Sequence, residues 1–157
     1  MYAYFAGGCF WCIEPIFNEL KGVHEVTCGY CGGKEPNPTY QEVKAQKTSH
    51  RETLRIKFDE SIVTFKELLT IFFSHVDLSD DSGQYIDRGH SYTLAVYYTC
   101  QSQKEIAIDM INSYKEPVYV SIEPFEIFYD AEEYHQHYYL KNPQEFEKEL
   151  IESGRKK

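Results

Sequence analysis

The sequence predicts an α+β fold, in which a mixed β-sheet has helices packed against it. Two observations support this prediction. The apolar residues change between strand-like and helix-like spacing in the order β-α-β, and then again β-α-β. The chain has 157 residues, of which 42% are hydrophobic and 16% aromatic, enough for the core of one domain over residues 1–157. We therefore expect a single domain with a core of the ferredoxin-like, split β-α-β type, followed by a long irregular C-terminal segment.

The first β-α-β unit occupies the beginning of the chain. Gly7 and Gly8 follow the first apolar run and turn the chain. Helical spacing comes next, with Pro15 in or near the first turn, where proline is tolerated. In order, we expect a strand at Tyr2–Ala6, a helix at Cys9–Leu20, a strand at Val23–Tyr30 and a Gly/Pro-rich loop through Thr39.

The second unit begins with a clear alternation of apolar and polar residues in "ETLRIKF". Two later segments carry the capping-box pattern of helix starts, Thr64 with Glu67 and Ser102 with Glu105. We expect strands at Glu52–Phe58, at Tyr92–Tyr98 and within Ile122–Asp130. We expect one helix at Thr64–Val76 and another that begins at Ser102 and has Tyr114 on its inward face. Helical turns should follow Ala131.

The charge of the chain excludes some function classes. The net charge is −9, and the only basic block is Arg155 with the two lysines that follow it. Such an acidic domain repels a phosphate backbone, so we expect no nucleic-acid partner. No stretch approaches the ~20 apolar residues of a membrane span, and the N-terminus lacks the pattern of a signal peptide. We expect a cytoplasmic protein, whose five cysteines serve chemistry or metal rather than structural disulfides.

Four of the cysteines form two C-x-x-C pairs, Cys9 with Cys12 and Cys28 with Cys31. Their spacing fits a four-cysteine zinc site, and it also fits a redox pair. Two large aromatic residues between the first two cysteines argue against a zinc knuckle. Cys9 also lies where a strand becomes a helix, and the N–H groups of a helix N-terminus stabilise a thiolate. A zinc-stabilised interaction domain and a thioredoxin-like disulfide oxidoreductase remain the alternatives to a cysteine-dependent enzyme.

Glu52 has the parity of the apolar residues in its strand. If the strand extends back to it, the carboxylate points toward the core, where burial keeps it protonated with a raised pKa. A neutral carboxylic acid near a thiolate can act as a general acid. Tyr92 shares the parity of Leu94 and Val96, which brings a phenol inward. In the alternative, Glu52 reaches solvent at a strand end and Tyr92 is one more core aromatic.

His135 and His137 in "EEYHQHYY" are separated by one residue. In a helix, two such side chains diverge by about 200°, so we expect no shared metal ion. We expect them to line or abut an aromatic pocket.

Several blocks of the sequence together resemble one enzyme family. They are "GGCFWC", "GYCGG", "NPTYQEV", "SHRETLRIKFD", "DRGHSYTLAVYY" and "YHQHYYLKNP". In this order, from about Tyr4 to Pro143, the chain resembles the A-type peptide-methionine (S)-S-oxide reductases. The resemblance implies an enzyme that reduces the S epimer of methionine sulfoxide, free or in proteins, without metal or bound cofactor.

The resemblance also implies roles for particular residues. Cys9 would be the nucleophile and Glu52 the acid. Tyr40 and Tyr92 would hydrogen-bond the sulfoxide oxygen. Four further residues would seat the substrate or shape the site: Phe10, Trp11, Asp87 and His135. Attack of Cys9 on the sulfoxide sulfur would release methionine and leave a sulfenic acid.

The thiol that resolves this sulfenic acid is open. Nothing after Cys100 can serve, and Cys12 is our first choice because a CxxC at a helix start can close a small redox disulfide. Cys31 is the second choice. In both cases a thioredoxin-like protein would reduce the disulfide. In a third scheme no internal thiol resolves Cys9, and glutathione or glutaredoxin reduces it directly. We interpret Cys28 and Cys100 as structural, and we expect a monomer.

Overall fold

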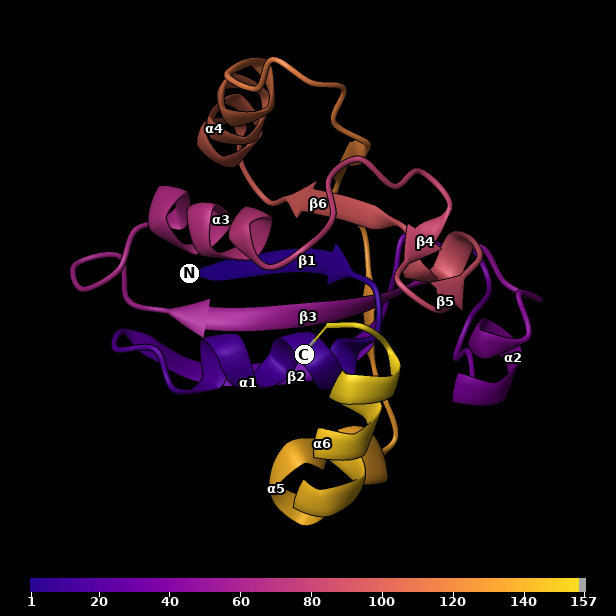
Figure 1. Ribbon diagram of the computed structural model, residues 1–157. Coiled ribbons are helices and arrows are strands. Elements are labelled where there is room, and N and C mark those ends of the chain that lie inside the picture. The colour runs from indigo at the N-terminus through magenta and orange to yellow at the C-terminus, as the bar shows by residue number, and fades with distance from the viewer. Residues whose placement is uncertain (156–157) are drawn as a thin grey trace.

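The computed structural model describes residues 1–155. Its main sheet has six strands in the order β7-β6-β1-β3-β2-β8 (Figure 1). The strands are β1 (Tyr2–Gly7), β2 (Val23–Cys31), β3 (Arg51–Phe58), β6 (Leu94–Tyr98), β7 (Val120–Pro124) and β8 (Phe128–Asp130), and a separate hairpin pairs β4 (Gly83–Gln84) with β5 (Asp87–Arg88).

Helical elements connect these strands and form the end of the described chain. They are α1 (Phe10–Asn18), α2 (Tyr40–Lys44), α3 (Phe65–Ser74), η1 (His90–Tyr92), α4 (Gln101–Asn112), η2 (Glu133–His135), α5 (Tyr138–Lys141) and α6 (Pro143–Glu152). Within residues 1–155, no helix has the length and apolar character needed to cross a membrane.

The central four strands confirm the predicted ferredoxin-like core. β6, β1, β3 and β2 pair antiparallel in this order, and α1 and α3 are the helices of the two β-α-β units. β7 extends one edge parallel to β6, and β8 extends the other antiparallel to β2, so the whole sheet is mixed. Both helices lie on the same side of the sheet in Figure 1.

The core lies between the sheet and these two helices. Phe5 of β1 stacks on Phe72 of α3 with ring centroids 4.8 Å apart, and it also contacts Phe17 of α1 at 5.9 Å. The three rings are buried. A smaller apolar cluster covers the opposite face of the sheet, where Tyr4 stacks on Phe125. Each face therefore has its own set of side chains, as the alternation in a strand requires.

Local signals placed some helices and strands correctly and others not. Thr64 and Glu67 form the predicted capping box of α3. The box predicted for Ser102 and Glu105 does not form, because α4 starts at Gln101 and puts Ser102 inside the helix. Its first turn is tied instead by the side chain of Gln103, which accepts from the backbone N–H of Thr99 at 2.9 Å.

Three further expectations need correction. The strand predicted at Tyr92 begins at Leu94, and Tyr92 lies in the short helix η1. The single strand expected within Ile122–Asp130 is two strands, β7 and β8, on opposite edges of the sheet. Tyr114 is exposed rather than inward, because α4 ends at Asn112.

The zinc alternative is also wrong. Neighbouring residues of a strand face opposite sides, and in β2 Cys28 belongs to the core under α1 while Cys31 belongs to the cluster on the other face. The four cysteines therefore cannot surround one ion. Among residues 1–155, no group of three His, Cys, Asp or Glu side chains is arranged to hold a metal.

Candidate active site

Cys9 lies at the start of α1, directly after the turn that ends β1. The turn needs a residue with positive φ, and Gly8 provides it with a φ of +87°. Cys9 is the N-cap residue of α1, and its carbonyl accepts the backbone N–H of Cys12 at 3.1 Å. Cys9 is half-buried, and Cys12 is 7% exposed. All five cysteines of the chain are unpaired thiols in this structure.

The thiols of Cys9 and Cys12 are hydrogen-bonded to each other. Because Cys9 donates, this bond raises the pKa of Cys9, and burial and the nearby carboxylates of Glu52 and Asp87 act in the same direction. The same bond lowers the pKa of Cys12 against the effect of burial, and Arg155 lowers it further. The expectation of a lowered pKa for Cys9 itself is thus not met in this arrangement. The first proton therefore belongs to the pair of thiols and not to either one. Once one sulfur is negatively charged, the other sulfur resists ionisation.

Glu52 lies on β3, paired across the sheet with Tyr30 of β2, and is 1% exposed. Its Oε1 accepts the backbone N–H of Phe10 at 3.2 Å, which ties the carboxyl group to the first turn of α1. Its Oε2 is buried and has no hydrogen-bond partner among residues 1–155. Burial raises the pKa of Glu52 to about 8, although the Phe10 N–H and the Tyr92 hydroxyl act in the opposite direction. At neutral pH the group is therefore mostly a carboxylic acid.

Two phenols flank this carboxyl group. Tyr92 of η1 is 7% exposed, and Tyr40 begins α2, where its backbone N–H donates to Glu132 at 3.0 Å. Burial and the charge of Glu52 raise the pKa of both phenols. Both hydroxyls therefore keep their protons and can donate hydrogen bonds. The sequence predicted an inward Tyr92 from the parity of a strand. In the structure, the short helix η1 before β6 places Tyr92 at the site instead.

Aromatic rings form the wall beside Cys9. The ring of Trp11 stacks on that of Tyr138, with centroids 4.0 Å apart, and its Nε1–H donates to Nδ1 of His135 at 2.9 Å. Phe10 is buried behind Trp11. Burial lowers the pKa of His135 to about 4, so the ring is neutral. Since Nδ1 accepts from Trp11, the proton of the neutral ring is on Nε2.

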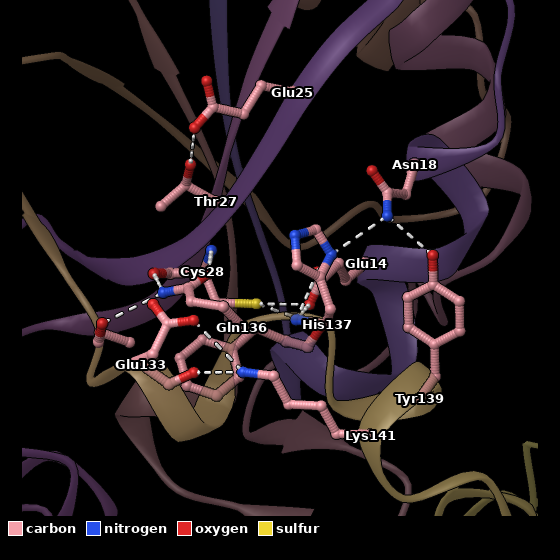
Figure 2. A network of polar contacts seen from close by, with 12 residues as sticks. Glu14, Asn18, Glu25, Thr27, Cys28, Glu133, Gln136, His137, Tyr139 and Lys141 are labelled. Carbon is pink, nitrogen blue, oxygen red and sulfur yellow. Dashed lines mark hydrogen bonds and ion pairs between the residues drawn. The ribbon is translucent and has the colours of Figure 1, made fainter.

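A network that the sequence did not suggest holds the C-terminal segment against α1 and β2 (Figure 2). Gln136 bonds the backbone N–H and C=O of Cys28 at 2.8 and 2.9 Å, as a neighbouring strand would. The buried carboxylate of Glu14 accepts from the Cys28 thiol at 3.0 Å and from the backbone N–H of His137 at 2.9 Å. The segment between these anchors carries His135 to Trp11, whereas His137 points to Glu14, so the two histidines share no site.

The site opens into a cavity of about 170 Å³. Several sequence-predicted residues line it: Cys9, Trp11, Cys12, Tyr40, Asp87 and Tyr92. Three others support it from behind, namely Phe10, Glu52 and His135, which are buried. Sequence reasoning missed the rest of the wall, which comprises Lys44, Ile86, Glu149, Glu152 and Ser153. Three of these five belong to or follow α6, and no motif in that segment pointed to the site.

The other cysteines lie away from this cavity. Cys31, the second choice as resolving thiol, is 1% exposed in the cluster on the opposite face of the sheet, so it cannot reach Cys9 across the intact sheet. Cys28 is buried under α1, and Cys100 is exposed at the start of α4. Cys12 is the thiol that shares the cavity with Cys9.

Comparisons with known proteins agree on one family. The family model described as peptide methionine sulfoxide reductase matches residues 1–157. The chain is 42% identical to a peptide methionine sulfoxide reductase MsrA of Bacillus subtilis, over 98% of the chain and 90% of that protein. It is also 42% identical to an MsrA/MsrB protein of Vibrio cholerae, over 96% of the chain and 41% of that longer protein.

Solved structures give the same result. Methionine sulfoxide reductase A of Corynebacterium diphtheriae superimposes with a TM-score of 0.86 at 30% identity, over 90% of this chain and 74% of that one. Mxr1 from Saccharomyces cerevisiae in reduced form superimposes with a TM-score of 0.84 at 28% identity, over 92% of this chain and 86% of that one.

Proposed function

The chain belongs to the peptide methionine sulfoxide reductase family, and from this premise we propose which of its groups carry the reaction. The enzyme reduces methionine sulfoxide to methionine, and we propose that a cysteine thiol supplies the electrons. We assign the reaction to the cavity in front of Cys9, within a single catalytic domain over residues 1–157. The substrate is the S epimer, free or in a protein.

Glu52, Tyr40 and Tyr92 activate the sulfoxide. Its sulfur is a weak electrophile until the oxygen is protonated or strongly hydrogen-bonded. Neutral Glu52 supplies a proton, and the two protonated phenols supply hydrogen bonds. The substrate methyl group lies against Trp11, and Phe10 packs behind that ring to complete the apolar seat. Asp87 at the cavity wall and His135 behind Trp11 shape the site.

Cys9 attacks the activated sulfur. As it does so, its proton passes to Cys12, to which it is already hydrogen-bonded. The oxygen then passes from the substrate sulfur to that of Cys9. The substrate S–O bond and the transient bond between the two sulfurs break, a new S–O bond forms on Cys9, and methionine leaves. Cys9 is then a sulfenic acid whose oxygen carries the proton from Glu52. One sulfoxide is reduced by two electrons, and the thiol sulfur of Cys9 is oxidised by two.

Cys12 then resolves the sulfenic acid. Its sulfur attacks that of Cys9, the S–S bond forms, and the hydroxyl group leaves as water. A thioredoxin-like dithiol reduces the Cys9–Cys12 disulfide and returns both thiols. Glutaredoxin or glutathione is the second candidate for this step. No metal and no bound cofactor takes part in this scheme. We further propose that the enzyme acts as a monomer in the cytoplasm.

One observation carries the assignment: the half-buried thiol of Cys9 and the protonated carboxyl of Glu52 meet at the first turn of α1. Glu52 accepts the N–H of Phe10, the residue directly after Cys9. A disulfide oxidoreductase has no use for a buried acid and two phenols at this place, so the arrangement favours chemistry on an oxygen-bearing substrate.

The test is a single turnover with methionine S-sulfoxide and no reductant, in which methionine formed and thiols lost are counted. We expect one methionine and two lost thiols in the wild type, and one lost thiol in Cys12→Ser. Cys31→Ser is the matched control, because it removes a buried thiol on the other face of the sheet, and it should lose two. One lost thiol in every protein would assign regeneration to an external thiol. Absence of methionine would refute the proposed site.

A further inference from the structure

The turn after α6 brings the end of the described chain back to the start of α1, where Figure 1 places it in front of that helix. The residue that arrives there is Arg155. Its Nη2 lies 3.5 Å from the carbonyl oxygen of Gly7, and its guanidinium lies over the ring of Tyr85 at 4.6 Å. Arg155 therefore sits beside the turn that presents Cys9 and the first turn of α1.

Cys12 and Arg155 share a second cavity. It has a volume of about 310 Å³ and is distinct from the substrate cavity, since Cys9 does not line it. Apolar side chains of α1 and α6 form much of its wall, including Ile16, Phe146 and Leu150. Cys12 lines both cavities, whereas Arg155 lines the second and not the substrate cavity.

Within the part of the chain that the structure describes, the guanidinium of Arg155 forms no ion pair, although its charge lowers the pKa of Asp87 against the effect of burial. Among residues 1–155, no carboxylate lies within ion-pair distance of its guanidinium, and its Nε is buried without a hydrogen-bond partner. A guanidinium in this position favours a negative charge nearby. Three other ionisable side chains line its cavity, those of Cys12, His75 and Tyr85, and of these three the thiol of Cys12 is the buried one. The carboxyl groups of Asp87 and Glu149 act on this thiol in the opposite direction to Arg155, since they raise the pKa of Cys12.

In the resting enzyme, two interactions lower the pKa of Cys12. The hydrogen bond from the Cys9 thiol has the larger effect, and the charge of Arg155 has the smaller one. That bond depends on the Sγ–H of Cys9. Once Cys9 has become a sulfenic acid, this donor is gone, while the charge of Arg155 remains in place. Arg155 is thus the fixed group that favours loss of the proton that Cys12 took from Cys9, so that Cys12 is a thiolate when it has to react.

We propose that Arg155 is a positioning residue for the resolving step, which holds Cys12 as a thiolate aimed at the sulfenic acid of Cys9. This rests on the proposed function. In the step, the thiolate of Cys12 attacks Sγ of Cys9, the S–S bond forms and the S–O bond breaks. Hydroxide leaves and takes up the proton that Cys12 released, so that water is the product. The oxidising equivalent comes from the methionine sulfoxide already reduced, and no other oxidant is needed.

The test compares Arg155→Gln and Arg155→Lys with the wild type in a single turnover at several pH values, with sulfenic acid trapped by a dione reagent. In Arg155→Gln we expect disulfide closure to be about 10-fold slower near neutral pH, with its pH midpoint about one unit higher. In Arg155→Lys, which keeps the charge, most of the closure rate should return. Lys148→Gln removes a charge from an exposed position on α6 and should close at the wild-type rate.

A second measurement does not depend on turnover. In a Cys9→Ser background, the rate of alkylation of Cys12 is followed against pH with and without Arg155→Gln. We expect the midpoint to rise when the arginine is removed. Unchanged midpoints in both measurements, or equal losses in Arg155→Gln and Arg155→Lys, would overturn the role of the charge. If the wild type forms no methionine, the proposed function fails, whereas the alkylation result still decides whether Arg155 acts on Cys12.

Discussion

Replacement of Glu52 by Gln tests the acid directly, because the amide keeps the shape of the side chain and its acceptor for the Phe10 N–H but has no carboxylic proton. A positioned general acid contributes roughly 10²- to 10⁴-fold to a rate. We therefore expect the burst of methionine in Glu52→Gln to be slower by a factor in this range, which corresponds to about 3–5 kcal/mol of transition-state stabilisation.

The pH dependence gives a sharper expectation. Since the pKa of Glu52 is raised to about 8, the wild-type burst rate should fall as pH rises through that value, approaching a tenfold loss per unit. Glu52→Gln should lack this alkaline decline. The assay is rapid-quench measurement of methionine between about pH 6 and about pH 10, with the enzyme in excess over the sulfoxide.

The same shift affects stability, and its sign follows from the direction of the shift. The pKa of Glu52 is higher in the folded protein, about 8, than its reference value of 4.5. Its stabilising contribution is complete below the unfolded pKa and is lost as pH rises toward 8. The difference of 8 − 4.5 units sets an upper bound of roughly 5 kcal/mol. Urea unfolding should therefore show that Glu52→Gln gains stability relative to the wild type between about pH 5 and about pH 8.

Glu14→Gln is the matched control, because Glu14 is also a buried carboxylate with a pKa raised by burial, but it lies outside the substrate cavity. Its folded fraction should show a pH-dependent difference from the wild type, while its burst rate should keep the alkaline decline. The reasoning is refuted if Glu52→Gln forms methionine at the wild-type rate, or if its burst rate falls above pH 8 as the wild type does.

Two further substitutions test the supports of the site. Gly8→Ala should lower the stability by about 1–3 kcal/mol, since Gly8 has a φ of +87° and an added Cβ would lie 2.8 Å from Arg155. Gly154→Ala should cost less, because its φ is +86° but an added Cβ would make only an ordinary contact, 3.8 Å from Tyr85. Equal melting temperatures for the wild type and both variants would contradict this. Tyr138→Leu removes the ring stacked on Trp11, so KM for the sulfoxide should rise about 2- to 10-fold with kcat little changed; steady-state kinetics that show an unchanged KM would remove Tyr138 from the support of the site.

Interactions between near neighbours in the chain explain what the sequence alone could predict. The alternation around Leu54 and Ile56 indicated β3, and Thr64 with Glu67 indicated the start of α3, because a strand face and a capping box each depend on residues a few positions apart. The burial of Glu52 followed from the same alternation and is confirmed. The resemblance to a family added the phenols and the aromatic residues, whose roles no local pattern could assign.

Contacts between distant parts of the chain decided the rest. Strand pairing places Cys31 on the face opposite to Cys9, although the two cysteine pairs look equivalent in the sequence. Arg155 reaches the turn at Gly7, 148 positions away.

The sequence by itself determined the β-α-β order, the position of Cys9 at a strand-to-helix turn, and the inward direction of Glu52. Only the tertiary structure decided which thiol shares the cavity with Cys9 and which charge lies beside that thiol. Gln136 and Glu14 show the physical reason, since each meets Cys28 through a side chain whose partner is specified by packing and not by spacing along the chain. The periodicity of the sequence indicates to which side of its own strand or helix a side chain points. Which residues that side chain contacts depends on how the strands and helices pack together.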